Sequence, residues 1–224
     1  MTISGCAAAS LQWLDERRRS QHCFLETADR CCYLWEYRPG RARDAAQRWI
    51  RDLKCSPLLA AVHLPAARKK ERALLHAAQA LRAAAPRAWV ERTSWCPIPP
   101  SARIGGPDYD DRLLRLLHMA FERYDADIRP LLRQSQSLPA DHRERRRVSV
   151  STLYGLLSVD TGQLGTRMLR PEVVLFDDVL TTGKHFKCAQ ARLRERLGPI
   201  SISACVLARR VLSPRRCGLA GAAV

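Results

Sequence analysis

Residues 173–184 have the sequence VVLFDDVLTTGK, and this stretch predicts the fold of the chain. Its first four residues are apolar and typical of a buried parallel strand. Residues 184–197 repeat apolar side chains at helical spacing up to Gly198, and residues 200–207 predict the next strand. Because strand, turn, helix and strand make a βαβ unit, we expect an α/β fold with a parallel sheet and helices on both faces.

The turn between that strand and that helix carries the chemistry. Asp177 and Asp178 follow the apolar run, at the strand end where open α/β sheets bind their ligands. Residues 181–184 offer backbone N–H groups at a helix N-terminus, which suits an anion, and Gly183 permits close approach of the backbone. Two carboxylates just before a phosphate site suit a ligand with hydroxyl groups near a phosphate, as in ribose 5-phosphate.

Two other interpretations of this stretch fit less well. A P-loop requires G-x-x-x-x-G-K-[ST], but Asp178 stands in place of the first glycine and His185 in place of the Ser or Thr. A helix N-cap would account for one aspartate, but not for two adjacent ones after an apolar strand. We therefore favour a ligand-binding role.

The stretch resembles the motif by which type I phosphoribosyltransferases bind phosphoribosyl diphosphate (PRPP): apolar residues, two acids, two apolar residues and T-T-G. The resemblance implies that Asp177 and Asp178 bind the ribose hydroxyls. It also implies a set of residues for the 5′-phosphate: Thr181, Thr182, Gly183, Lys184 and His185. The family usually has Thr at the position of His185, so an imidazole N–H would replace a hydroxyl there.

More of the chain, about residues 43–210, resembles the ComF-like branch of that family. The segment CPIPPS at 96–101 resembles the strand end and pyrophosphate loop of that branch, and YDDR at 109–112 stands where the branch has R-G-F-N. Residues 128–159 resemble its flexible loop and returning strand. The implied pyrophosphate ligands are Pro100, Ser101, Arg103, Arg133 and Arg146. The four-Cys zinc finger of the branch is not matched, so zinc is not implied.

The resemblance implies a type I phosphoribosyltransferase-like fold and a transferase activity. Pyrophosphate would be displaced from ribose C1′ by an unidentified acceptor, with positioning and electrostatics providing most of the catalysis. Mg²⁺ is implied as the cofactor, carried by PRPP, with Asp177 and Asp178 as its candidate protein ligands. The alternative is a non-catalytic protein on the same fold that senses PRPP or binds nucleic acid.

Apolar spacing elsewhere predicts helices from residue 42, at 68–85 and at 108–124. It predicts strands at 95–98, 128–132 and 154–159, with a mobile basic loop at 133–151. We expect three parts along the chain: an N-terminal extension or hood at 1–42, the phosphoribosyltransferase-like domain at 43–212, and a C-terminal tail at 213–224.

The composition bears on partners and location. Thirty-eight Lys and Arg against 22 Asp and Glu give a formal charge of +16, which admits nucleic acid as a partner but also fits a genomic bias toward Arg. Nine cysteines without a C-x-x-C pair favour reduced thiols in a cytoplasmic protein. No charge-free stretch is long enough to span a membrane, so we expect no membrane partner. A homodimer stays open as an alternative to a monomer.

Overall fold

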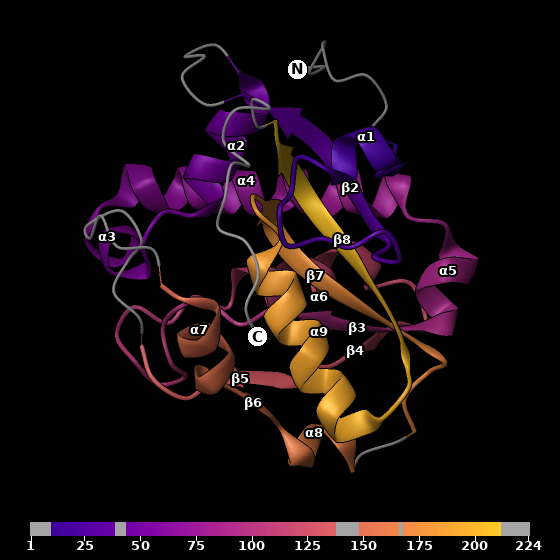
Figure 1. Ribbon diagram of the computed structural model, residues 1–224. Coiled ribbons are helices and arrows are strands. Elements are labelled where there is room, and N and C mark those ends of the chain that lie inside the picture. The colour runs from indigo at the N-terminus through magenta and orange to yellow at the C-terminus, as the bar shows by residue number, and fades with distance from the viewer. Residues whose placement is uncertain (1–9, 39–43, 138–147, 166–167, 212–224) are drawn as a thin grey trace.

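The structure, a computed structural model, describes residues 10–38, 44–137, 148–165 and 168–211 of the 224-residue chain. Its centre is a six-stranded sheet flanked by helices (Figure 1). The elements in chain order are β1 (Gln12–Trp13), α1 (Glu16–Arg19), β2 (Cys31–Tyr37), α2 (Ala45–Leu53), α3 (Pro57–Val62), α4 (Leu64–Ala84), α5 (Arg87–Arg92), β3 (Thr93–Pro97), α6 (Arg112–Phe121), β4 (Asp127–Ile128), β5 (Leu132–Gln134), α7 (Val150–Leu156), β6 (Leu157–Val159), α8 (Thr161–Leu164), β7 (Glu172–Leu180), α9 (Lys184–Leu197) and β8 (Ser201–Arg210).

The sheet is mixed but mostly parallel. Its strand order is β1-β2-β8-β7-β3-β4, and every neighbouring pair is parallel except β1 with β2. The expected βαβ unit is confirmed as β7, α9 and β8. However, β7 does not end before the two aspartates: it continues through Leu180, because Val179 and Leu180 stay in register with Ala208 and Arg209 of β8.

Helices cover both faces of the sheet, and each face has its own apolar core. On one face α4 and α6 pack through Leu74, Leu81 and Leu116 against Trp95 and Phe176 of the sheet. On the other face α9 packs against a second cluster. Each fully buried leucine contributes roughly 2 kcal/mol through apolar surface removed from water, so both layers hold the central strands firmly.

The segment after β3 differs from its expected structure in two places. The strand expected at 128–132 is divided into β4 and β5 on either side of Pro130, which has no N–H for a sheet ladder. The strand expected at 154–159 is wrong for its first half, which belongs to α7. The Ser149 side chain accepts from the Thr152 N–H and caps this helix, and the Tyr154 hydroxyl donates to Glu195 of α9 at 2.7 Å.

The expected loop at 133–151 is also shorter than predicted, because β5 pairs with β6 in a two-stranded ribbon and α7 begins at Val150. Residues 138–147 lie outside the described ranges. Tertiary pairing has therefore given structure to polar segments whose sequence shows no period.

The N-terminal part contributes directly to the central sheet. Strand β2 lies within the segment 1–42, for which we expect an extension or hood, and it runs parallel to β8. The domain boundaries at 42 and 212 stay predictions, and the expected tail at 213–224 lies outside the described residues. None of the helices in the described ranges combines the length and the apolar character that crossing a membrane requires.

Candidate functional site

The two sequence segments expected to bind ligand follow the carboxyl ends of two neighbouring inner strands of the sheet. Strands β3 and β7 are parallel neighbours, with Cys96 opposite Leu175. From β3 the chain passes through α6 on one face to β4, and from β7 it passes through α9 on the other face to β8. The carboxyl ends of β3 and β7 are therefore a topological switch point, where open α/β sheets form a ligand crevice. Residues 98–111 and 181–183 are the two segments that leave this point.

Asp178 is held by two cations rather than standing open to a ligand. Its side chain is 5% exposed, and Lys54 Nζ lies 2.8 Å from Oδ1. Arg112 contacts Oδ2 through Nε at 3.1 Å and through Nη2 at 2.5 Å. Burial by itself would raise the pKa of Asp178, but the charges of Lys54 and Arg112 hold it well below its ordinary value, so the carboxylate is ionised.

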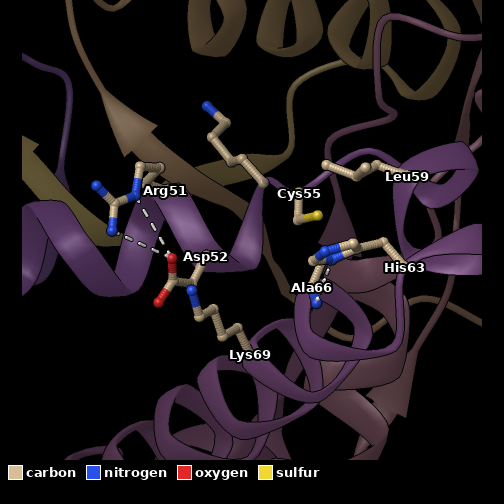
Figure 2. A pocket seen from close by; sticks show the side chains of 8 residues that line it. Arg51, Asp52, Cys55, Leu59, His63, Ala66 and Lys69 are labelled. Carbon is tan, nitrogen blue, oxygen red and sulfur yellow. Dashed lines mark hydrogen bonds and ion pairs between the residues drawn. The ribbon is translucent and has the colours of Figure 1, made fainter.

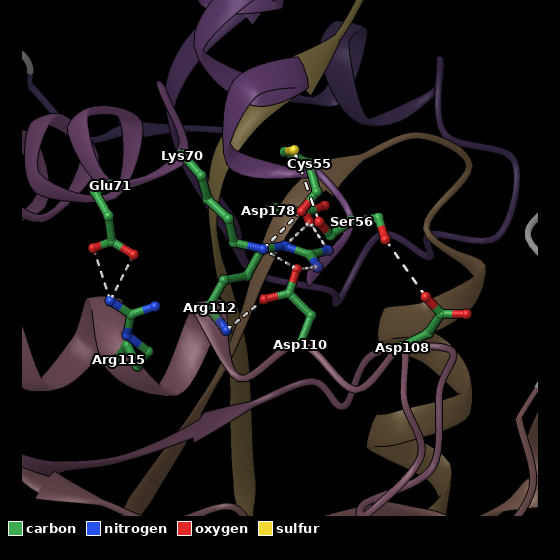
Figure 3. A network of polar contacts seen from close by, with 9 residues as sticks. All are labelled: Cys55, Ser56, Lys70, Glu71, Asp108, Asp110, Arg112, Arg115 and Asp178. Carbon is green, nitrogen blue, oxygen red and sulfur yellow. Dashed lines mark hydrogen bonds and ion pairs between the residues drawn. The ribbon is translucent and has the colours of Figure 1, made fainter. Parts of the chain in front are cut away.

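The network extends from Arg112 to a second buried acid (Figure 3). Arg112 Nη1 lies 2.9 Å from Asp110 Oδ2, and Lys70 Nζ of α4 lies 2.7 Å from the same oxygen. Lys70 also donates to the Cys55 carbonyl at 2.7 Å. These contacts connect the end of α2, the middle of α4, the start of α6 and β7 through one set of charges.

Asp177 has a different environment from its neighbour. Successive residues of a strand point to opposite faces, so the two aspartates diverge. Asp177 is half-buried, makes no ion pair with any described residue, and its Oδ1 accepts the Asp178 N–H at 2.7 Å. Burial, followed by the negative charge of Asp178, raises the pKa of Asp177 above its ordinary value.

The turn that follows β7 has the backbone shape of an anion site. Gly183 is the N-cap of α9 with φ +86°, a left-handed conformation that favours glycine, and its own N–H lies at the helix start. Thr181 is exposed and Thr182 half-buried, so both can be reached from solvent. A Cβ added at Gly183 would lie 2.7 Å from Leu25 Cδ2, so this position also has no room for a side chain.

Residues 22–24, which are distant in the sequence, hydrogen-bond to the backbone carbonyls of this turn. The buried His22 is hydrogen-bonded through Nδ1 to the Thr181 carbonyl, and the Phe24 N–H donates to the Thr182 carbonyl at 3.0 Å. A carbonyl only accepts, so the His22 proton is on Nδ1, and Nε2 faces Arg209 Nη1 at 3.5 Å. Burial lowers the pKa of His22 to about 4, which keeps the ring neutral.

Lys184 and His185, the first two residues of α9, differ in their exposure to solvent. Lys184 Nζ donates to the Val148 carbonyl at 2.5 Å, so one of its three donors is used within the protein. His185 is exposed on the first turn of α9. A phosphate at this turn would meet backbone N–H groups and the threonine hydroxyls, with two donors of Lys184 still available to it.

The residues expected to bind pyrophosphate are brought together only in part. Pro100, Ser101 and Arg103 follow β3 at the switch point; Ser101 and Arg103 are exposed, and the Arg103 N–H donates to Ser137 at 3.1 Å. Arg133 lies in β5, where Nε contacts Asp160 at 2.6 Å. Arg146 lies outside the described ranges.

The donor set does not fit a Mg²⁺ ion held by the protein. Mg²⁺ requires oxygen ligands in near-octahedral geometry, whereas both oxygens of Asp178 are already occupied by cationic side chains. One oxygen of Asp177 is occupied by a backbone N–H. Within the described ranges no group of three or more His, Cys, Asp or Glu side chains is arranged to hold a metal ion.

A surface pocket of about 430 Å³ lies where α2, α3 and α4 meet (Figure 2). Lys54 lines this pocket and also pairs with Asp178, so the pocket adjoins the charge network. The pocket is lined by Arg51, Asp52, Lys54, Cys55, Leu59, His63, Ala66 and Lys69.

Sequence reasoning missed three residues that contact the candidate site: Lys54, Arg112 and His22. Lys54 belongs to the region of the helix predicted from residue 42, and Arg112 belongs to the helix predicted at 108–124 and to the YDDR segment, but neither residue has a role assigned from the sequence. Nothing local marks them, because each acts on a residue at least 66 positions away. A scan of protein-family models finds no match to the chain, and a search of curated proteins finds none.

Proposed function

We propose that this chain is a phosphoribosyltransferase with a type I phosphoribosyltransferase-like fold. One observation carries the proposal: the T-T-G turn, with a left-handed Gly183 as the N-cap of α9, and residues 98–111 follow the carboxyl ends of the neighbouring parallel strands β7 and β3 at a switch point. This topology supports a ligand site to which the turn would contribute anion-binding N–H groups and the exposed Ser101 and Arg103 would contribute polar side chains.

In the proposed complex each part of PRPP has its own contacts. The 5′-phosphate binds the backbone N–H groups of residues 181–184 and the hydroxyls of Thr181 and Thr182, assisted by the positive end of the α9 dipole. Asp177 accepts hydrogen bonds from ribose hydroxyls. Ser101 and Arg103 bind the pyrophosphate, which leaves with the electrons of its bond to C1′ as the acceptor forms a new bond there and loses a proton.

Mg²⁺ enters the proposal only as an ion that PRPP carries, because both Asp178 oxygens already contact cationic side chains, which would repel a metal ion there. The acceptor is not assigned. The positive charge of the chain would favour binding of the polyanionic donor in any case.

The direct test measures pyrophosphate release from PRPP in a panel of nucleobases and amines. We expect release with at least one acceptor, and we expect Arg103→Gln to raise the KM for PRPP about tenfold through loss of a charged phosphate contact. Arg123→Gln is the matched control, because the Arg123 side chain is 81% exposed at the end of α6 and should leave KM unchanged. Absence of PRPP binding would refute the proposal.

The second candidate is a non-catalytic protein that senses PRPP or binds nucleic acid on the same fold. The observation that favours it is Asp178, whose charge is already compensated by Lys54 and Arg112. Tight PRPP binding without release of pyrophosphate in the presence of any acceptor would support a sensing role. Nucleic-acid binding would show a steep salt dependence and should be weakened by charge reversal at Arg145, Arg146 and Arg147.

A further inference from the structure

The two cations that hold Asp178 are not equivalent. The Arg112 side chain is 14% exposed and contacts two buried carboxylates, Asp178 and Asp110, so its donors are largely used within the protein. The Lys54 side chain is 43% exposed and contacts Asp178 through Nζ at 2.8 Å. Arg112 is therefore part of the interior, whereas Lys54 is a cation at the surface of the site.

Lys54 has the chemistry to join the carboxylate to a ligand. An ammonium group has three donors, and the described structure uses one of them on Asp178 Oδ1. The others are available to a phosphate or hydroxyl oxygen from the solvent side. A cation placed between a protein carboxylate and a ligand oxygen is the arrangement in which a bound divalent ion serves phosphorylated ligands.

We propose that the Lys54 ammonium group supplies the cation of this site, so that a phosphorylated ribose binds here without a divalent metal ion held by the protein. For the identity of that ligand the proposal rests on the proposed function. Its own support is geometric: both Asp178 oxygens are taken by side-chain cations, and one of these cations faces solvent.

Position explains why Lys54 can do this. Lys54 is the C-cap residue of α2 and directly follows Leu53, which is 1% exposed. Because Leu53 anchors the end of the helix in the core, the backbone of Lys54 is held in a defined position. The positive side chain also complements the negative end of the α2 dipole. Burial by itself would lower the pKa of Lys54, but the negative charge of Asp178 outweighs this effect and raises the pKa. The ammonium group therefore stays charged beside Asp178.

The experiment uses calorimetry on the wild type, Lys54→Gln and Lys69→Gln. PRPP in Mg²⁺ establishes that the site binds its ligand, and ribose 5-phosphate, which lacks the pyrophosphate that carries Mg²⁺, is then titrated in EDTA and in Mg²⁺ for the affinities compared below. Lys69 lines the same pocket as Lys54 but is not paired with Asp178, so it is the matched control. We expect wild-type and Lys69→Gln affinities to be nearly equal in the two conditions. For Lys54→Gln we expect a loss of about tenfold in EDTA, partly restored by Mg²⁺.

A wild-type affinity that falls about tenfold in EDTA would overturn the proposal, and so would a Lys54→Gln affinity equal to that of the wild type. Failure of PRPP to bind the wild type in Mg²⁺ would instead refute the proposed function.

A second measurement, made without PRPP, tests whether Lys54 occupies the place that a divalent metal ion would take beside Asp178. Titration with Mn²⁺ alone, followed by the electron paramagnetic resonance signal of the free ion, is made on the wild type and on Lys54→Gln. We expect Mn²⁺ affinity to rise about tenfold in Lys54→Gln, because Asp178 Oδ1 is released, and to fall again when Asp178→Asn is added. Unchanged Mn²⁺ affinity in Lys54→Gln would overturn the proposal, as would wild-type binding that Asp178→Asn abolishes.

Discussion

Arg112 Nη2 lies 2.5 Å from Asp178 Oδ2, although the two residues are 66 positions apart in the chain. This contact joins the start of α6, directly after residues 98–111, to the carboxyl half of β7. A buried ion pair therefore joins the residues that flank the two segments proposed to bind opposite ends of one ligand. Substitutions at Arg112 and Asp178 should have non-additive effects on the free energy of unfolding, because neighbouring members of one charge network are not energetically independent.

The first prediction concerns the stability of Asp178→Asn. On sequence alone we expect that neutralising both aspartates leaves the empty protein as stable as before; the ion pairs reverse that expectation for Asp178. We now expect the free energy of unfolding to fall by about 3 kcal/mol, near the lower end for broken buried ion pairs, because Arg112 keeps Asp110.

Urea denaturation of the wild type and Asp178→Asn provides the measurement. Asp111→Asn is the control, because Asp111 is an exposed N-cap residue of α6 whose side chain makes no capping hydrogen bond. Equal stability of Asp178→Asn and the wild type would contradict the ion pairs described here.

The second prediction is that Asp177→Asn increases the free energy of unfolding, and that this increase depends on pH. The pKa of Asp177 is raised in the folded state, so the folded protein binds more protons than the unfolded chain, and its stability falls as pH rises above about 4. Asparagine removes this cost and still accepts the Asp178 N–H. We expect Asp177→Asn to gain roughly 2 kcal/mol over the wild type at about pH 8, and little at about pH 4.

Thermal unfolding at those two pH values checks the sign. A stability difference that is the same at both, or that grows toward acid, would mean that Asp177 is ionised at its ordinary pKa and lies in water.

The third prediction compares two glycines that both have a left-handed backbone. Gly183 has φ +86° and Gly198 has φ +75°. Alanine costs about 1–2 kcal/mol at either position from backbone conformation alone. At Gly183 the new Cβ would also lie within 2.8 Å of the Leu25 side chain, whereas at Gly198 it meets nothing within 4 Å. We therefore expect Gly183→Ala to be the more destabilising by roughly 1–3 kcal/mol.

Denaturant titrations of the two alanine variants give that difference directly. Phosphate binding should be weakened only in Gly183→Ala, since Gly198 stands at the far end of α9. If both variants lose the same stability, Leu25 does not pack against the turn.

The fourth prediction concerns His22 and acid. Burial lowers the pKa of His22 to about 4, so the unfolded chain binds the extra proton at a higher pH than the folded protein does. The contribution of His22 to stability is therefore complete above about pH 6.5 and is lost as pH falls toward 4, on the order of 2 kcal/mol by pH 5.

His22→Asn keeps an N–H donor for the Thr181 carbonyl but does not titrate. We expect this variant to lose less stability than the wild type between about pH 7.5 and 5. Parallel pH profiles for the two proteins would show that the buried His22 is not the group that titrates.

The sequence by itself determined the central βαβ unit and the shape of its turn. Helix α9 occurs at 184–197 as predicted, because its apolar spacing, Gly183 before it and Gly198 after it are local signals that act within a few residues. The α/β class follows from the same pattern, since an apolar run followed by a helix and a second apolar run can bury its surface only in a layered parallel sheet.

Only the tertiary structure decided what the two adjacent aspartates do. Their identical chemistry gives no local reason to distinguish them. The continuation of β7 to Leu180 directs them to opposite faces, where Asp178 meets Lys54 and Arg112 from helices packed on one side and Asp177 meets neither in an ion pair. Such contacts depend on strand order and helix packing across many residues, and the spacing of residues along the chain does not encode them.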